Sequence, residues 1–93
     1  MKIIVKYYGF TREVTGKNYE TIIMQTDQKL KDIIYNLIKR YSQLSQIMLN
    51  EEGEPSDYLT YFIEGVNIHS LQGFNTVPKD GSTVVIAPTI VGG

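Results

Sequence analysis

Alternating apolar and polar positions at the start of the chain predict a β-strand over residues 2–8. Because successive side chains of a strand point to opposite sides, this strand has two distinct faces. Gly9 ends the strand, and residues 10–16 suit one helical turn with Thr11 as its N-cap and Gly16 at its close. The two strand faces consist of Ile3, Val5 and Tyr7 on one side and Ile4, Lys6 and Tyr8 on the other.

The next apolar segments predict a second strand and then the main helix. Residues 19–25 are rich in β-branched and aromatic residues, and the turn at 16–18 lets them pair back onto the first strand as a wide hairpin. Thr26 and Asp27 are a favourable helix start, so we expect a helix from about residue 27 to residue 42. Its apolar residues recur with helical spacing, at Leu30, Ile33, Ile34, Leu37, Ile38 and Tyr41.

The second half of the chain predicts a loop followed by three strands. Apolar residues at 44–49 should pack back on the core, and residues 50–57 form an acidic, exposed loop, either simply solvated or an acidic docking site. Strands are predicted over residues 58–64 and 82–87, with a short one near 66–68 and a turn at residues 79–81.

This order of elements predicts an α+β protein with a β-grasp fold, formed by residues 1–93 as one domain. The first and last strands should pair in parallel, because a long connection separates them. One main helix can cover only one face of such a small mixed sheet, so the other face stays partly open. Tyr8 shares a strand face with Lys6, and we expect it to point away from the helix.

Composition excludes several classes of function. The 93 residues include no cysteine, which excludes disulfides, a thiolate nucleophile and a cysteine-ligated metal. Nine basic and ten acidic residues leave a net charge of −1, which argues against nucleic-acid binding. The first residues read as a strand and the chain has no long apolar run, so we expect a cytoplasmic protein without a membrane segment.

Few residues are candidates for catalysis. His69 is the only histidine and has no carboxylate at a spacing that suggests a catalytic triad. Most of the seven tyrosines are expected to be packing residues, with Tyr8 as the exception. We therefore expect a protein that is not an enzyme and holds neither a metal nor a cofactor.

The last residues, APTIVGG, offer a different kind of chemistry. Pro88 cannot donate to a strand ladder, so we expect it to end the last strand and residues 88–93 to form a flexible arm. Thr89 to Gly93 can extend roughly 17 Å, and the two glycines lack a Cβ, so the tip can enter a narrow site of another protein. The carboxylate of Gly93 is then the group presented.

A carboxylate reacts only after activation, which an adenylating partner using ATP can supply. A sulfur nucleophile would then give a terminal thiocarboxylate, whereas a lysine amine would give an isopeptide. In both cases the chain is the substrate of other enzymes. A third possibility is a binding module with an inert tail, in which removal of Gly92 and Gly93 has no effect.

Three segments resemble the MoaD/ThiS-like family of ubiquitin-like sulfur carriers, and most closely the small subunit of molybdopterin synthase. They are KYYGFTREVTG at 6–16, LKDIIYNLIKRY at 30–41 and EGVNIHSLQGFNTVPKDGSTVVIAPTIVGG at 64–93. The last segment carries the most specific signal, because a turn with Asp80 and Gly81 precedes a strand, a proline and the terminal Gly-Gly. The sequence departs from the family pattern at Ser82, Ala87 and Thr89.

The resemblance implies a carrier in molybdenum cofactor biosynthesis, with an E1-like adenylating enzyme and the large catalytic synthase subunit as partners. Gly93 would bear the acyl-adenylate and then the thiocarboxylate, with Gly92 before it. Tyr8 and Ala87 would contact partners, and the residues threaded into the large subunit would be Pro88, Thr89, Ile90 and Val91. Sulfur transfer to thiamin or to tRNA, and conjugation to lysines, stay open as alternatives.

Overall fold

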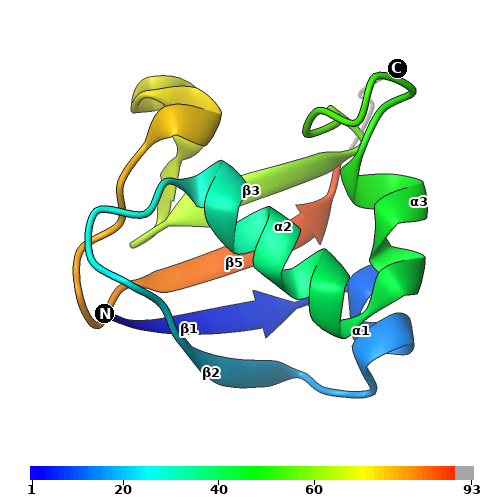
Figure 1. Ribbon diagram of the computed structural model, residues 1–93, viewed down its shortest axis with the longest axis horizontal. Helices are drawn as coiled ribbons and strands as arrows, with labels where there is room; N and C mark the ends of the chain where they lie inside the picture. The colour runs from blue at the N-terminus through cyan, green and yellow to red at the C-terminus, as the bar shows by residue number, and fades with distance from the viewer. Residues whose placement is uncertain (90–93) are drawn as a thin grey trace.

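The computed structural model describes residues 1–89 as a five-stranded mixed sheet with helices packed on one side (Figure 1). The strand order is β2-β1-β5-β3-β4, and β1 and β5 pair in parallel at the centre while every other neighbouring pair is antiparallel. This arrangement confirms the predicted α+β class and β-grasp fold. The strands are β1 (Lys2–Tyr7), β2 (Tyr19–Ile23), β3 (Leu59–Ile63), β4 (Val66–Asn67) and β5 (Thr83–Pro88).

Helix α2 crosses the sheet and shorter helical segments close its ends (Figure 1). No helix within residues 1–89 is both long enough and apolar enough to cross a membrane. The helical segments are α1 (Phe10–Thr15), α2 (Leu30–Arg40), η1 (Ser42–Leu44), α3 (Ser45–Met48), η2 (Ile68–Ser70) and η3 (Gly73–Asn75).

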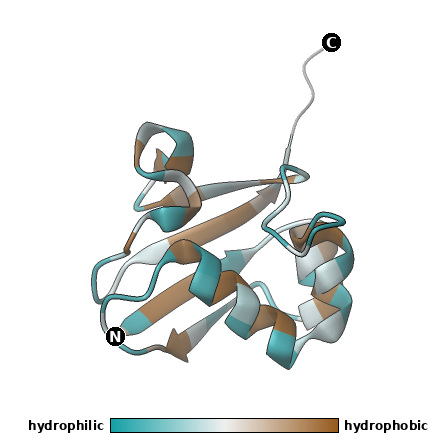
Figure 2. Cartoon of the chain, turned by 45° about the horizontal axis from the view of Figure 1, so that its top comes forward, coloured by the Kyte–Doolittle hydropathy of each residue, from teal (hydrophilic) through white to brown (hydrophobic). Residues whose placement is uncertain are grey.

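The core lies between α2 and the sheet, as the two apolar periodicities predict. Figure 2 shows apolar residues concentrated along the central strands. Leu44 and Met48, from the predicted apolar tail, also lie in this core. Its fully buried members include Ile3, Val5 and Tyr7 of β1, Val84 and Ile86 of β5, and Leu30, Ile33, Ile34 and Leu37 of α2.

The predicted start of the main helix was three residues too early. Asp27 has φ 63°, a left-handed conformation that an α-helix does not contain. Lys29 is the N-cap, and its backbone N–H donates to the Asp32 carboxylate at 2.9 Å. The N–H of Leu30 donates to the carbonyl of Thr76 at 2.8 Å, so a distant loop satisfies one of the free donors of the first turn.

The short helix α1 was predicted correctly at its end but not at its start. Gly16 closes it in the left-handed conformation, with φ 70°, and donates its N–H to Arg12. Gly9, not Thr11, is the N-cap. Thr11 is buried inside the helix and its hydroxyl donates to the carbonyl of Tyr8 at 2.9 Å, which fixes α1 to the end of β1.

The acidic loop at residues 50–57 is irregular and mostly exposed, as predicted, but it is held at two points. The hydroxyl of Tyr35 donates to the carbonyl of Gly53 at 3.1 Å. Ser56 is buried, and its N–H donates to Met48 at 2.9 Å while its hydroxyl donates to Ile47. The chain therefore enters β3 from a fixed position.

Candidate functional site

The candidate site lies where β5 ends, between the central strands β1 and β3 (Figure 1). β5 includes Pro88, opposite Leu59, so it continues one residue beyond the predicted end. The carbonyl of Thr83 accepts a hydrogen bond from the N–H of Glu64, which directly follows β3, and the N–H of Thr89 donates to the carbonyl of Tyr58, which directly precedes β3. The odd-numbered residues of β5 therefore form their backbone hydrogen bonds with β3. The ring nitrogen of Pro88 faces the other way, past the end of β1, where no strand partner is lost.

Thr89 extends the attachment of the chain beyond the strand. Its N–H donates to the carbonyl of Tyr58 at 3.3 Å. Its hydroxyl lies 3.0 Å from the hydroxyl of Thr60 and donates to the carbonyl of Asp57 at 3.2 Å. The arm predicted from residue 88 is thus bound to the β3 side through Thr89, although both Pro88 and Thr89 are exposed.

Gly9 packs directly against the ring of Pro88. A Cβ atom at Gly9 would lie 2.7 Å from Cγ of Pro88, a distance that real side chains do not reach. Gly9 also has φ 60° and ψ −132°, a conformation that strongly favours glycine. Gly9 therefore packs the start of α1 directly against Pro88 at the base of the candidate arm.

Tyr8 and Ala87, the two partner contacts that the family resemblance implies, lie at the same end of the sheet. The β1–β5 register pairs Tyr7 with Ile86, so Tyr8 and Ala87 follow at adjacent positions. Tyr8 is 45% exposed and Ala87 is half-buried. We call the sheet side away from α2 the open face, and Tyr8 continues it just beyond β1, beside Lys6 and Tyr19. Within the strands it carries Lys2, Ile4 and Lys6 of β1, Tyr19, Thr21 and Ile23 of β2, Thr60 and Phe62 of β3, and Thr83, Val85 and Ala87 of β5.

Two shallow pockets flank this end of the sheet. One, of about 300 Å³, is formed by the base of the arm and two residues of β3. The other, of about 370 Å³, is formed around Tyr8. The first is lined by Thr60, Phe62, Ala87, Pro88 and Thr89, and the second by Lys6, Tyr7, Tyr8, Arg12, Asn18 and Tyr19.

Several exposed residues near the site were not predicted. Tyr19 and Tyr58 are 64% and 65% exposed, whereas the sequence interpretation kept only Tyr8 apart from the packing tyrosines. For Tyr19 a signal was available: it alternates with buried Ile22 along β2 and therefore belongs to the open face. Aromatic residues and arginine are the residue types enriched at protein interfaces, so Tyr19 and Arg12 extend the candidate contact area around Tyr8.

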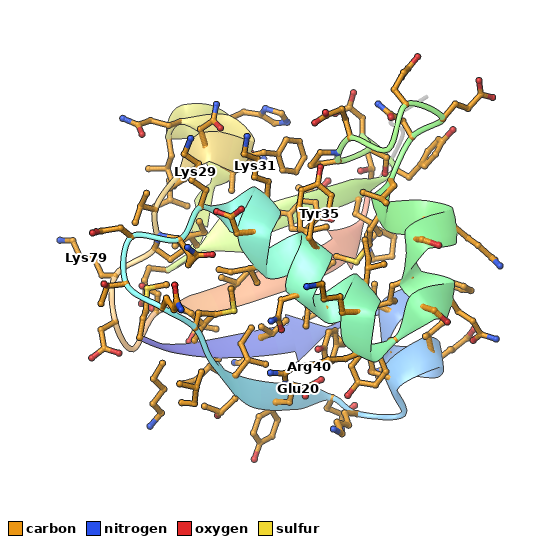
Figure 3. All side chains as sticks on the ribbon, viewed as in Figure 1. Glu20, Lys29, Lys31, Tyr35, Arg40 and Lys79 are labelled. Carbon is orange, nitrogen blue, oxygen red and sulfur yellow. The ribbon has the colours of Figure 1, made fainter. Side chains whose placement is uncertain are left out.

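Hydrogen bonds around Glu20 connect the β1–β2 hairpin to the end of α2, where Figure 3 shows Glu20 beside Arg40. The carboxylate of Glu20 accepts from the hydroxyls of Tyr7 at 2.6 Å and Tyr41 at 2.8 Å. Lys17 and Arg40 lie 3.5 Å and 3.8 Å from the same carboxylate. Burial works to raise the pKa of Glu20, but the hydrogen bonds from Tyr7 and Tyr41 and the nearby Lys17 outweigh it and lower the pKa.

The remaining candidates contribute no catalytic cluster within residues 1–89. His69 is exposed in η2, and its backbone N–H bonds to the side chain of Asn67. No group of three or more metal-ligating side chains occurs in this part of the chain. Ile90, Val91, Gly92 and Gly93 lie outside the described residues.

Comparison with known proteins connects this geometry to a family. A relative from Archaeoglobus fulgidus, whose name proposes a sulfur carrier role, is 31% identical over 64 residues, which is 64% of this chain and 73% of the relative. The structure is similar to that of small archaeal modifier protein 1 from Methanosarcina acetivorans, with a TM-score of 0.85, 23% identity and coverage of 99% and 96% of the two chains.

A second solved structure, described as molybdopterin converting factor subunit 1 from Pyrococcus furiosus, matches with a TM-score of 0.78 and 22% identity over 96% of this chain and 98% of that one. These identities establish a shared fold. The sequence model of the ThiS family matches residues 5–93, which includes most of the open face and the terminal Gly-Gly. The chain therefore belongs to the ThiS family of small ubiquitin-like sulfur carrier proteins.

Proposed function

We propose that this protein carries sulfur for molybdopterin synthesis, as the small subunit of a molybdopterin synthase. The observation that carries the proposal is the family match, which continues through Gly92 and Gly93. The similarity in fold to a structure described as a molybdopterin converting factor subunit is consistent with this pathway. In this role the chain supplies a reactive carboxyl group, and the catalytic groups belong to its partners.

The proposed chemistry takes place at the carboxyl carbon of Gly93. The carboxylate attacks the α-phosphate of ATP on the E1-like adenylating enzyme and displaces pyrophosphate. Hydrosulfide then attacks the acyl-adenylate carbon, the bond to AMP breaks, AMP leaves, and loss of a proton gives the thiocarboxylate. On the large synthase subunit its sulfur attacks a carbon of the pterin precursor and displaces an oxygen substituent from that carbon, and hydrolysis of the acyl–sulfur bond leaves the sulfur on the pterin and restores the carboxylate.

The contacts of Pro88 and Thr89 support the proposed presentation of Gly93. Thr89 is hydrogen-bonded to Tyr58 and Asp57, and Pro88 is packed against Gly9, so the last described residues have a fixed position. Four residues separate Thr89 from the end, which corresponds to roughly 14 Å when extended. The partners would contact Tyr8 and Ala87 on the open face and take Pro88, Thr89, Ile90 and Val91 into their active sites.

Intact-mass measurement tests the carrier role. Protein purified from its own cells, without reductive or alkaline steps, should contain a fraction whose mass corresponds to replacement of one oxygen by sulfur. Deletion of Gly93 should abolish this fraction while leaving the thermal unfolding transition unchanged. If the fraction is absent from wild-type protein although the adenylating enzyme is expressed, the sulfur carrier role is wrong.

A loss-of-function strain tests the pathway separately. The proposal expects loss of molybdopterin, with normal thiamin and normally thiolated tRNA. Restoration by the wild-type protein but not by the Gly93 deletion would connect the loss to the terminal glycine. Loss of thiamin or of tRNA thiolation alone would instead assign the carrier to that other acceptor.

A ubiquitin-like modifier role is the second candidate, and the structural similarity to small archaeal modifier protein 1 favours it. Both roles use an activated Gly93, but only the modifier forms an isopeptide with lysine. Trypsin-digested cell extracts should then contain lysines that carry residues 80–93 of this chain as a branched remnant, because Lys79 is its last tryptic cleavage site. These peptides should disappear when Gly93 is deleted, and their absence from wild-type cells would exclude conjugation.

A further inference from the structure

Strand β2 forms one edge of the sheet and pairs only with β1. At the two ends of this pairing, Tyr7 donates its N–H to Asn18 at 2.8 Å and Met24 donates to Met1 at 2.7 Å. Antiparallel hydrogen bonding alternates along a strand, so the even-numbered residues of this segment bond toward β1. The backbone N–H and C=O groups of Tyr19, Thr21 and Ile23 therefore point outward from the sheet edge.

The outer edge of β2 lacks the usual protection against further pairing. Natural edge strands are blocked by outward-facing lysine, by proline, by bulges or by a covering segment. The five residues of β2, YETII, contain no lysine or proline and pair with β1 in an unbroken register. Tyr19, Thr21 and Ile23 are all exposed, and the two large side chains are 64% and 70% exposed.

We propose that β2 pairs antiparallel with β2 of a second copy of this chain, about a two-fold axis that passes through Thr21. In this register Thr21 faces the partner's Thr21 and Tyr19 faces the partner's Ile23, on the open face of both copies. Each of these pairs joins outward-pointing backbone groups, so each forms two hydrogen bonds between the strands. Aromatic residues opposite β-branched residues, and threonine opposite threonine, are favourable cross-strand pairs.

The electrostatics of β2 are compatible with a second copy at this edge. Glu20 is the only charged residue of the strand, and its carboxylate is held toward α2 by Tyr7 and Tyr41. The formal net charge of −1 creates little repulsion between two chains. A second copy is the occupant that the edge fits best, because the pattern Tyr-Glu-Thr-Ile-Ile is complementary to itself when reversed about Thr21.

The opposite edge of the sheet does not offer the same match. β4 contains only Val66 and Asn67, which is too short to supply three hydrogen-bonded pairs. Pairing through β2 would occupy Tyr19 of the candidate contact area but would leave the ends of the two β5 strands uncovered. The two-fold axis makes these strands antiparallel and places four strands between them, so the two Pro88 residues lie on opposite sides of a continuous ten-stranded sheet.

Sedimentation equilibrium of the full-length protein tests this pairing. The wild-type chain should show a reversible monomer–dimer equilibrium between about 10 μM and 1 mM, because the interface is small. Thr21→Lys places like charges opposite each other at the two-fold axis and should lower the association constant at least tenfold. Thr26→Lys, also at an exposed threonine but beyond the strand, adds the same charge and should leave the constant within about twofold.

Hydrogen exchange at the two concentrations locates the interface. The amides of Tyr19, Thr21 and Ile23 should exchange fast in dilute solution and at least tenfold more slowly in concentrated solution. Those of Glu20 and Ile22, which bond to β1, should be protected in both. A wild-type protein that stays monomeric at 1 mM, an equal effect of the two lysine variants, or a dimer with fast exchange at Thr21 would each overturn the proposal.

Discussion

The two faces of the sheet are built from the same strands but are used differently. Toward α2, alternate residues such as Val84 and Ile86 are buried at 0% and 1% exposure. On the open face their neighbours, including Val85 and Ala87, are only half-buried, and Tyr8 and Tyr19 are exposed. One face therefore supplies the stability of the domain, and the other can change with little effect on folding. In a small carrier protein, this separation leaves a whole face available to partners.

Substitutions at two neighbouring positions of β5 test this difference between the two faces, and one of them should have the largest effect on stability. Ile86→Ala should lower the free energy of unfolding by about 2–5 kcal/mol, because it removes buried methyl groups and leaves a cavity under α2. Val85→Ala, one residue away on the open face, should cost less than about 1 kcal/mol. Urea denaturation followed by circular dichroism measures both. Equal losses would mean that the open face is part of the core.

Gly9 tests whether the base of the arm depends on close packing. Gly9→Ala should destabilise the protein by about 1–3 kcal/mol, since it adds a strained backbone conformation and a clash with Pro88. Gly16→Ala is the comparison variant: Gly16 has φ 70° and ψ 16°, an ordinary left-handed conformation, and no atom lies within 4 Å of an added Cβ, so it reports a milder backbone strain without a clash.

The signals of Pro88 isolate the contact with Gly9, because the two variants differ in backbone strain as well as in the clash. Nuclear magnetic resonance of Gly9→Ala should show shifted signals for Pro88 and Thr89, whereas Gly16→Ala should leave them in place. If the Pro88 signals do not move in Gly9→Ala, the packing of Gly9 does not fix the position of Pro88.

Substitution of Glu20 should have a smaller effect on the free energy of unfolding, and this effect should depend on pH. Glu20→Gln should cost about 1 kcal/mol at pH 7, because it weakens the acceptor for the hydroxyls of Tyr7 and Tyr41. The pKa of Glu20 is lower in the folded state than its ordinary value of 4.5. Its stabilising contribution is therefore complete above about pH 4.5 and is lost as the pH falls through the folded-state pKa.

Denaturation curves at a series of pH values check the direction of this pH dependence. The wild-type protein should be more stable than Glu20→Gln at pH 7, and the difference should shrink as the pH falls below 4.5. A difference that stays constant or grows on acidification would mean that the carboxylate is not stabilised by its neighbours in the folded protein.

Local sequence patterns predicted the two faces of the sheet well. Alternation in β1 and β5 and the helical spacing of α2 each assign residues to a face, and the structure confirms those assignments. Contacts between distant segments were not predictable in this way. The start of α2 depends on the left-handed conformation of Asp27 and on a hydrogen bond from Leu30 to Thr76, which no local pattern contains.

In the candidate site, too, local sequence predicted some features and contacts between distant segments determined the others. The terminal glycines and Pro88 could be identified from the sequence, because their chemistry depends on residue type. The attachment of Thr89 to Tyr58 and the packing of Gly9 on Pro88 needed the tertiary structure, since these contacts join residues far apart in the chain. The exposure of Tyr19 could have been predicted from its place in the alternation of β2, but it was missed because most of the seven tyrosines were expected to be packing residues.

Tyr8 provides the test with the smallest effect on stability, and it addresses the open face directly. Tyr8→Arg should change the free energy of unfolding by less than about 0.5 kcal/mol, because the side chain is 45% exposed. If the adenylating enzyme of the same organism uses this face, calorimetric titration should show affinity weakened roughly tenfold or more. Val77→Arg is the control, since Val77 is 43% exposed in the segment before β5 and should leave affinity unchanged. Equal affinities for the two variants would show that Tyr8 is outside the interface, and the open face would then lose its assigned role even though its residues tolerate substitution.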